Sequence, residues 1–377
     1  MKRCGYCDFY SNTEFDREII SKTLDKILIS LECSLSELRP NKIATIYIGG
    51  GTPSLIPPAA LGAFLESMNS MLGVVEEFSI EANPESLSRE FLEVLAECRV
   101  DRISLGVQTY SNELLNWLGR SGGTSALDRA ENLLDELWNG RLSRDLLAAI
   151  PYRKDRLNRD IDRASVNSPG HISVYELTVE EQSSLAEDSK KLGELPDEKT
   201  AVLEWETALR RLKEIGYVRY EVSNFAIPGE ESQHNLAYWR MQPYLGVGPG
   251  AFSTIPDDRS LAVRRSETGN LHTWLSLPTG SYVESELSVR DFALEHFIMG
   301  MRMSEGISTE NFGRIFELDP AKLVPKALSR RIASGDVISK GGRIRPSVPG
   351  MDFVDSILMD FALELDEFCW PASYDWP

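Results

Sequence analysis

The sequence predicts an α/β protein whose first part is built on a parallel sheet. Between about residues 16 and 215, short strands of buried-type residues alternate with amphipathic helices. That alternation is typical of βα units, in which ligands bind beyond the carboxyl ends of the strands. Right-handed crossovers permit an open, doubly wound sheet or one that curls towards a barrel. Beyond residue 288 the pattern predicts a smaller helical or winged-helix-like module.

Each element of the first part follows from a local pattern. Apolar residues at helical spacing predict a helix over 16–38, and a β-branched run predicts the first strand over 44–48. Pro57-Pro58 suits the first turn of the next helix. We expect four more strands, over 77–81, 102–107, 145–150 and 171–177. Helices are expected from 57 and from 88, around 114–118, and over 127–138 and 197–215.

The chain after residue 215 divides into two further parts. Residues 216–287 include the segment HNLAYW and end in a polar, turn-rich stretch, 256–287, that predicts a linker. From Val289 the helical pattern returns, followed by a turn at Gly341-Gly342 and a helix over 351–366. The sequence therefore predicts three regions, 1–215, 216–287 and 288–377.

Composition excludes several classes of protein. The formal charge of −18 should repel phosphate backbones, so nucleic acid is not expected as a partner. No apolar run is long enough to span a membrane. Five cysteines, mostly isolated, indicate a reducing compartment rather than a disulfide framework. We expect a cytoplasmic protein.

Polar and glycine-rich residues follow the predicted strands at their carboxyl ends, which indicates one shared pocket. They are Gly49-Gly50-Gly51-Thr52, Glu81-Ala82-Asn83, Gln108, Asp145 and Glu176. Glycines let a backbone approach a ligand closely, and carboxylates accept from hydroxyl or amino groups. A tight turn would equally explain the glycines, and helix N-capping would explain the two acids.

Other residues have both a functional and an ordinary explanation. Arg120 can pair with a ligand carboxylate or with a neighbouring acid. His234 can ligate a metal or haem iron, although a lone histidine is more often a hydrogen-bonded structural residue. Tyr238 and Trp239 can stack on a flat ligand or pack in the core. Cys4 and Cys7, at C-x-x-C spacing, need further ligands before they can hold a metal or an iron–sulfur cluster.

The order of the motifs is more specific than any one of them. CGYCDF, GGGTPS, EANP, SLGVQT and HISVYELT follow one another along the predicted βα units, and YEVSNFA, HNLAYW and YLGVGPGA continue the series. This order resembles the radical SAM superfamily, specifically its coproporphyrinogen dehydrogenase-like branch and, within that branch, the HemW haem-chaperone family. The resemblance extends to about residue 254, and more loosely beyond it.

The resemblance implies a partial (β/α)6, TIM-like barrel that holds a [4Fe–4S] cluster and S-adenosylmethionine at its mouth. Residues 1–215 would form this core, 216–287 a HemW-type extension, and 288–377 an α+β, winged-helix-like domain. Cys4 and Cys7 match the second and third cluster cysteines. The positions that match S-adenosylmethionine contacts are Tyr6, Gly50, Gly51, Thr52, Glu81, Gln108, Arg120 and Asp145.

The sequence departs from the family's pattern at its start. The first cluster cysteine would lie four residues before Cys4, just outside the chain, and the first barrel strand would precede it. We therefore expect an N-terminally truncated barrel that lacks this strand, with an incomplete set of cluster ligands. A late-assigned start and a degenerate copy are both compatible with this pattern. Gly122 and Phe252 also stand where the family often has histidine.

The resemblance implies haem binding and transfer to haemoproteins, including membrane-bound ones, with His234 and Trp239 as candidate haem contacts. Phe9 stands where the anaerobic coproporphyrinogen dehydrogenases carry a further cysteine, which favours a chaperone over that enzyme. Radical decarboxylation of coproporphyrinogen III is the alternative, and an inactive scaffold without the cluster is a third. Membrane association would come through the partners, and a homodimer is one option for the assembly.

Overall fold

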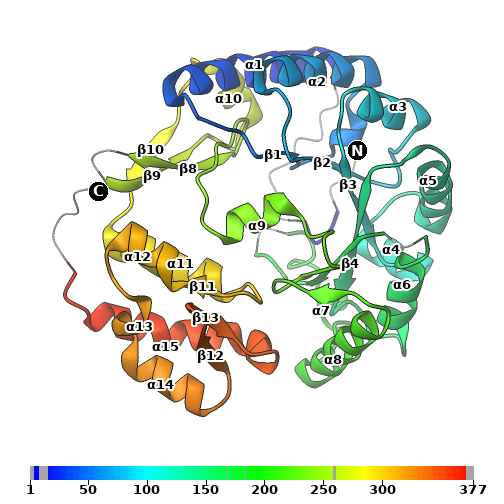
Figure 1. Ribbon diagram of the computed structural model, residues 1–377. Helices are drawn as coiled ribbons and strands as arrows, with labels where there is room; N and C mark the ends of the chain where they lie inside the picture. Colours follow the sequence, from blue (N-terminus) through cyan, green and yellow to red (C-terminus); the bar gives the residue numbers. More distant parts are fainter. Residues whose placement is uncertain (1–3, 8–15, 168, 182, 258–259, 371–377) are drawn as a thin grey trace. The chain divides into compact units, whose positions relative to one another are not determined.

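The computed structural model describes residues 4–7, 16–167, 169–181, 183–257 and 260–370 (Figure 1). The chain divides into two compact units. Unit 1 comprises 1–218, 223–234 and 270–280, and unit 2 comprises 219–222, 235–269 and 281–377. None of the described helices has the length and apolar character needed to cross a membrane.

Unit 1 contains the predicted parallel sheet. Five parallel strands, neighbours in chain order, begin the sheet: β1 (Thr45–Ile48), β2 (Glu77–Ala82), β3 (Arg102–Gln108), β4 (Arg141–Ala148) and β5 (His171–Glu176). β7 (Asn224–Ala226) joins β5 antiparallel, and β6 (Val218–Arg219) lies outside β7. This arrangement confirms the α/β, radical SAM-type fold predicted from the sequence.

Helices between successive strands cover the outer face of this sheet (Figure 1). They are α1 (Arg17–Leu38), α2 (Pro58–Leu72), α3 (Arg89–Glu97), α4 (Asn112–Leu118), α5 (Gly123–Leu137), α6 (Arg156–Ala164), α7 (Ser189–Leu192) and α8 (Glu198–Glu214), with α10 (Leu271–Ser276) added later in the chain. Asp16, Ser88 and Asp197 cap the starts of α1, α3 and α8 by accepting from backbone N–H groups. Leu61, Leu65 and Phe91 are nearly or fully buried, as the apolar stripes predict.

The predicted start of the fourth strand was wrong. β4 begins at Arg141 rather than near Asp145, because the side chain of Arg144 is buried within the strand. Its Nη1 donates to the carbonyl oxygens of Ala164 (2.8 Å) and Val166 (3.1 Å), which satisfies a group that would otherwise be costly to bury. A sequence pattern that treats arginine as exposed misses this half of the strand.

The linker predicted over 256–287 was also wrong. This stretch contributes to a three-stranded antiparallel sheet, β10-β9-β8, made of β8 (Phe252–Asp257), β9 (Ser260–Ser266) and β10 (Val283–Glu286). Ile255 and Val263 are buried, whereas the charged residues pair with one another. Arg265, for example, donates to Glu284 across the β9–β10 pair. Cross-strand pairs of this kind stabilise a sheet whose sequence looks polar.

The C-terminal part of unit 2 has the predicted helical, winged-helix-like composition. The small antiparallel sheet β11-β13-β12 is surrounded by helices. Its elements are α11 (Val289–Met301), β11 (Ile307–Ser308), α12 (Thr309–Phe316), α13 (Pro320–Leu323), α14 (Pro325–Ala333), β12 (Val337–Lys340), β13 (Arg343–Pro346), η2 (Pro349–Phe353) and α15 (Val354–Glu367). Gly341 and Gly342 turn between β12 and β13 with φ of +65° and +73°, a region that favours glycine.

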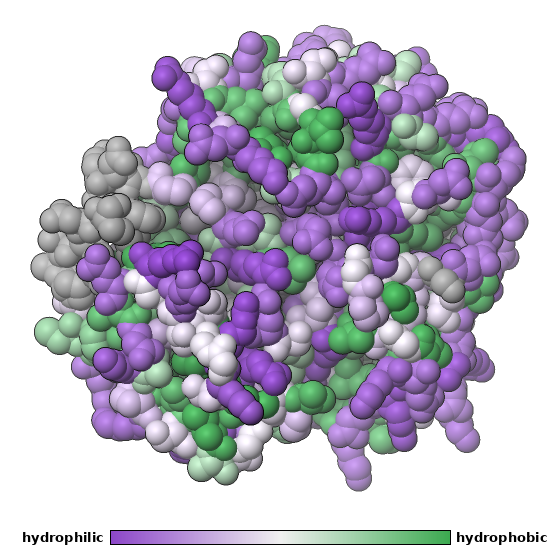
Figure 2. Space-filling view, viewed as in Figure 1, coloured by the Kyte–Doolittle hydropathy of each residue, from purple (hydrophilic) through white to green (hydrophobic). Residues whose placement is uncertain are grey.

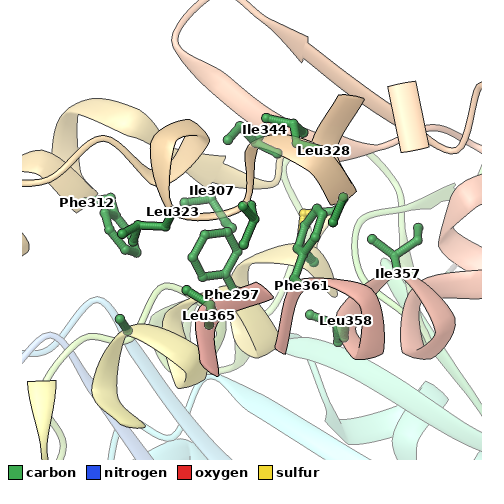
Figure 3. Packing of buried hydrophobic residues seen from close by; sticks show 14 of the residues in the cluster. Phe297, Ile307, Phe312, Leu323, Leu328, Ile344, Ile357, Leu358, Phe361 and Leu365 are labelled. Carbon is green, nitrogen blue, oxygen red and sulfur yellow. The ribbon is translucent and has the colours of Figure 1, made fainter. Parts of the chain in front are cut away.

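An apolar core holds these elements together. Phe297 of α11 and Phe361 of α15 are fully buried and meet edge to face at 5.5 Å between ring centroids. Ile307, Phe312 and Ile344 extend the same cluster (Figure 3). Hydrophilic side chains cover most of the visible face of the molecule, with apolar residues in smaller groups among them (Figure 2).

Candidate functional site

The two N-terminal cysteines lie on a tight turn that is tied to unit 1. The N–H of Cys7 donates to the carbonyl oxygen of Cys4 at 3.2 Å. Gly5 donates to the carbonyl oxygen of Leu118 at 3.1 Å and accepts from the N–H of Leu185 at 2.8 Å. Both thiols are free and half-buried. The turn is therefore held at the C-terminal end of α4, with two adjacent thiols available.

Arg120 connects this turn to the sheet. Its guanidinium is buried and lies 3.8 Å from the sulfur of Cys4. It donates to the carbonyl oxygen of Gly106 at 2.5 Å and to Oδ1 of Asn83 at 3.1 Å, and it pairs with Glu85 at 3.3 Å. A buried arginine needs such partners, since an unpaired buried charge is strongly unfavourable. They hold one cation beside the cysteine turn.

Tyr6 lies between the two thiols in sequence and packs against an apolar cluster that includes Leu114, Leu118 and Ile150. Burial raises the pKa of its phenol, and the charges of Cys4 and Cys7 contribute in the same direction, whereas Arg120 opposes them. Tyr6 therefore stays neutral, and its hydroxyl can donate to, or accept from, a ligand or a neighbour.

The glycine segment after β1 leaves its backbone accessible. A Cβ atom at Gly50 or at Gly51 would meet nothing within 4 Å, and Gly50 has φ of +94°. At Gly49, by contrast, a Cβ would come within 2.6 Å of Tyr47 and 2.7 Å of Glu81. Gly49 is thus required for close packing, while the next two glycines offer backbone groups to a ligand.

Glu81 brings a carboxyl group next to the end of β2, and Asp145 brings another from inside β4, three residues before the end of that strand. Burial raises the pKa of Glu81 to about 7, and the nearby charge of Asp145 adds to the shift. Burial likewise raises the pKa of Asp145, although Ser173 and Ser104 donate to its carboxyl group. Oδ1 of Asp145 is buried and has no hydrogen-bond partner among the described residues. An acceptor of this kind is suited to an amino or hydroxyl group of a ligand.

Gln108 ends β3 in an unusual conformation. Its φ is +68°, and the register between β3 and β4 shifts between Gly106 and Gln108. A Cβ at Gly106 would lie 3.1 Å from Nε2 of Gln108 and 3.6 Å from Nη2 of Arg120, so the two side chains converge over this glycine. Strained residues of this kind concentrate at binding sites.

Two residues that connect the site were not assigned a role from the sequence, although Asn83 belongs to the polar segment after the second strand. Asn83 donates from Nδ2 to Thr52 at 3.0 Å and accepts from Arg120, so it joins the glycine segment to the cysteine turn. Tyr47 donates its hydroxyl to Glu81 at 2.7 Å. The position of Asn83, two residues after Glu81 at a strand end, was the available signal for the first. The inward-facing place of Tyr47 on β1 gave no comparable signal.

The structure places His234 and Trp239 in different units, although both belong to α9 (Gln233–Trp239). His234, in unit 1, stacks on Tyr47 and shares a hydrogen bond of 2.9 Å between its Nδ1 and Thr45. Trp239, in unit 2, lines a cavity of about 90 Å³ together with His296 and Met303. The candidate haem contacts therefore have separate surroundings.

The polar groups at the strand ends suit S-adenosylmethionine, whereas the two cysteines supply only part of the ligand set of a [4Fe–4S] cluster. The buried, unpartnered oxygen of Asp145 and the accessible backbone at Gly50 and Gly51 suit a polar ligand at the strand ends. Cys4 and Cys7 supply two free cysteine side chains. Within the described ranges no group of three or more His, Cys, Asp and Glu side chains forms a metal site. Phe9 and the cysteine expected before Met1 lie outside the described residues.

Comparison with known proteins agrees with this fold. Residues 1–152 match the Radical SAM superfamily, and residues 287–353 match the HemN C-terminal domain. The solved structure of the Escherichia coli coproporphyrinogen III oxidase (HemN), a radical SAM enzyme, superposes with a TM-score of 0.80 at 17% identity, over 96% of this chain and 87% of that one. The matches and the fold define a protein of the radical SAM superfamily, which implies a [4Fe–4S] cluster and S-adenosylmethionine.

Sequence relatives narrow the assignment. The chain is 30% identical to the heme chaperone HemW of Lactococcus lactis, over 96% of this chain and 94% of the relative. It is 30% identical to the heme chaperone HemW of Escherichia coli, over 97% and 96% of the two chains. The radical S-adenosyl methionine domain-containing protein 1, mitochondrial, of Danio rerio is 31% identical over 98% of this chain and 86% of its own. The chain belongs to the HemW family.

Proposed function

We propose that this protein binds haem and transfers it to haemoproteins, using a [4Fe–4S] cluster and S-adenosylmethionine. The observation that carries the proposal is the 30% identity, over nearly the full length of the chain and so over both units, to proteins described as heme chaperones HemW. Three further points stay predictions: that haem passes to a partner protein, that this partner lies in a membrane, and that the protein forms a homodimer. Haem added to the purified protein should give a shifted Soret band, and its absence would contradict the proposal.

The strand ends of unit 1 are the proposed S-adenosylmethionine pocket. Glu81 and Asp145 would accept from its amino group and ribose hydroxyls, and the backbone of Gly50, Gly51 and the side chain of Thr52 would line it. When bound, a cluster of this class supplies an electron to the sulfonium. The remaining pocket residues would close the space around both groups: Tyr6, Gln108 and Arg120 beside the thiolates of Cys4 and Cys7.

Asn83→Ala should weaken S-adenosylmethionine binding by about 5- to 10-fold, because the loss of one ordinary hydrogen bond costs roughly 1 to 1.5 kcal/mol. The substitution releases Thr52 from Arg120 without removing a proposed contact. Isothermal titration of the purified protein with S-adenosylmethionine measures the change. Asn69→Ala is the matched control, since Asn69 donates to the carbonyl oxygen of Cys98, outside the pocket. Equal affinities of Asn83→Ala and wild type would exclude this role.

The proposed haem contact with the better geometric support is Trp239. Its cavity is lined by apolar side chains, Met303 among them, and by Arg240 and Arg343, both of which are paired with Glu305. Flat aromatic ligands stack on tryptophan, and propionates pair with arginine. A cavity of about 90 Å³ admits only an edge of a porphyrin, so the walls would have to part for deeper entry. His234 stays the second candidate.

Trp239→Ala should weaken haem binding by about 10-fold, since stacking and apolar contact together contribute roughly 1 to 2 kcal/mol. Titration of haem followed at the Soret band gives the dissociation constant. Trp205→Ala, which removes a tryptophan from α8 of unit 1, is the matched control and should bind as wild type does. If both variants bind haem equally, Trp239 is not a haem contact.

Radical decarboxylation of coproporphyrinogen III is the second candidate function. It is favoured by the structural match to the Escherichia coli coproporphyrinogen III oxidase and by the HemN C-terminal domain at residues 287–353. An anaerobic assay with reductant and S-adenosylmethionine distinguishes the two. Formation of protoporphyrinogen IX would contradict a chaperone-only role, and its absence with haem binding intact would support that role.

A further inference from the structure

His234 is packed against the proposed S-adenosylmethionine pocket through one intermediate residue. Its ring lies over that of Tyr47, with centroids 4.9 Å apart and planes inclined by 19°. Nδ1 shares a hydrogen bond of 2.9 Å with the hydroxyl of Thr45. The hydroxyl of Tyr47 in turn donates to Oε1 of Glu81 at 2.7 Å. A continuous set of contacts therefore leads from His234 to the Glu81 carboxyl group.

The backbone of His234 is fixed as firmly as its ring. Its N–H donates to Oε1 of Glu77 at 3.0 Å, and the N–H of Gln233 donates to Oε2 at 3.1 Å. Glu77 is fully buried and is bound by Arg102 at 3.0 Å. All of these residues belong to unit 1. A side chain held from two directions in this way can set the position of the ring that it stacks on.

Tyr47 has little freedom apart from His234. Gly49 also packs closely against this ring, since an added Cβ would come within 2.6 Å of it. The ring therefore has close neighbours in both the glycine segment and the imidazole, and its hydroxyl donates to Glu81. Moving the imidazole would free the ring and release the hydrogen bond on the carboxyl group. The effect would reach a ligand of Glu81 without any contact between that ligand and His234.

We propose that His234 is a positioning residue for the S-adenosylmethionine pocket, acting through Tyr47 on the carboxyl group of Glu81. This inference rests on the proposed function, in which Glu81 accepts from the ligand's amino or hydroxyl groups. It assigns His234 a role different from iron coordination. Nδ1 shares a hydrogen bond with Thr45, so this nitrogen is not available to an iron while that bond and the stacking on Tyr47 are in place.

Four variants test separately the contacts that lead from His234 through Tyr47 to Glu81. Tyr47→Phe keeps the stacked ring and removes the hydrogen bond to Glu81, whereas His234→Phe keeps a stacked ring and removes the bond to Thr45. His234→Ala removes both contacts of the histidine, and His234→Ala/Tyr47→Phe is the double variant. His272→Ala and Tyr152→Phe are matched controls, because both residues are exposed and belong to other segments, α10 and the loop after β4.

Isothermal titration with S-adenosylmethionine and Soret titration with haem are measured on each full-length variant whose circular dichroism matches wild type. Tyr47→Phe and His234→Ala should each weaken S-adenosylmethionine binding by about 3- to 10-fold, the usual effect of one lost hydrogen bond. The double variant should bind within about twofold of the weaker-binding of the two single variants, because both changes interrupt the same series of contacts. His234→Phe should be weakened less than His234→Ala, and haem affinity should stay within about twofold of wild type in all four.

Unchanged S-adenosylmethionine affinity in Tyr47→Phe and both His234 variants would overturn the inference. So would a double variant whose loss is the product of the two single losses, or a His234→Phe variant that loses the Soret shift while it binds S-adenosylmethionine normally. Wild-type protein that binds neither S-adenosylmethionine nor haem would overturn the proposed function as well. Wild-type binding of both, with no effect of the variants, would overturn the positioning role alone.

Discussion

Glu77→Ala is expected to lower the free energy of unfolding by about 3 to 5 kcal/mol, the largest effect of any single substitution in unit 1 that we predict. Burial alone would raise the pKa of Glu77, but Arg102 and the N–H groups of His234 and Gln233 lower it, so the side chain is ionised in the fold. Removing it leaves the guanidinium of Arg102, which is only 2% exposed, without its anion. It also leaves Ser232 and two backbone N–H groups without their acceptor.

Urea denaturation followed by circular dichroism measures this loss. Glu76→Ala is the matched control, because the neighbouring Glu76 is exposed and its ion pair with Lys42 is solvated. Surface pairs contribute at most about 1 kcal/mol, so Glu76→Ala should stay close to wild type. If Glu77→Ala loses less than about 1 kcal/mol, the buried ion pair does not stabilise the segment that carries His234.

The second large effect is a fall in stability with rising pH that comes from Glu81. Burial and the charge of Asp145 raise the pKa of Glu81 from 4.5 to about 7, despite hydrogen bonds from Tyr47 and Gly50. Between these two pH values the folded protein keeps a proton that the unfolded chain has already lost. Stability therefore decreases as pH rises through this window, by up to about 3 kcal/mol. Glu81→Gln cannot titrate and should remove this part of the pH dependence.

Urea midpoints of the ligand-free protein at about pH 5 and about pH 8 test this prediction. The difference between the two midpoints should be smaller in Glu81→Gln than in wild type, and Glu76→Gln should behave as wild type does. In the variant, a smaller decrease in stability with rising pH should remain, because burial also raises the pKa of Asp145. Parallel profiles of wild type and Glu81→Gln would show that Glu81 ionises in the fold at its ordinary pKa.

Much of unit 1 could be predicted from sequence because its strands and helices have distinct periods. The five parallel strands were anticipated within a few residues, except that Arg144 concealed the first half of β4. That error has a physical origin, since a buried arginine satisfied by carbonyl oxygens has the sequence signature of a surface residue. The sheet β8-β9-β10 was missed for a related reason, because paired charges such as Arg265 and Glu284 hide its alternation.

The position of the candidate pocket could be predicted from the strand order, whereas the hydrogen bonds and packing contacts between its residues could not. Parallel strands bring their carboxyl ends to one edge, so Glu81 and Gln108 could be grouped from the strand order, whereas Asp145 lies inside β4. The links through Asn83 and Tyr47 depend on side-chain rotamers and on close packing at Gly49, which no periodicity encodes. The same limit applies to His234, whose partners on β1 are distant in sequence.

The chain passes from unit 1 to unit 2 within α9, between His234 and Asn235. One short helix thus carries the residue proposed to support the S-adenosylmethionine pocket and Trp239, the proposed haem contact. If α9 transmits a displacement, the two ligands share a coupling free energy, and thermodynamic linkage makes that energy reciprocal. Whatever factor S-adenosylmethionine applies to the affinity for haem, haem must apply to the affinity for S-adenosylmethionine. The binding of haem would then change the measured affinity for S-adenosylmethionine.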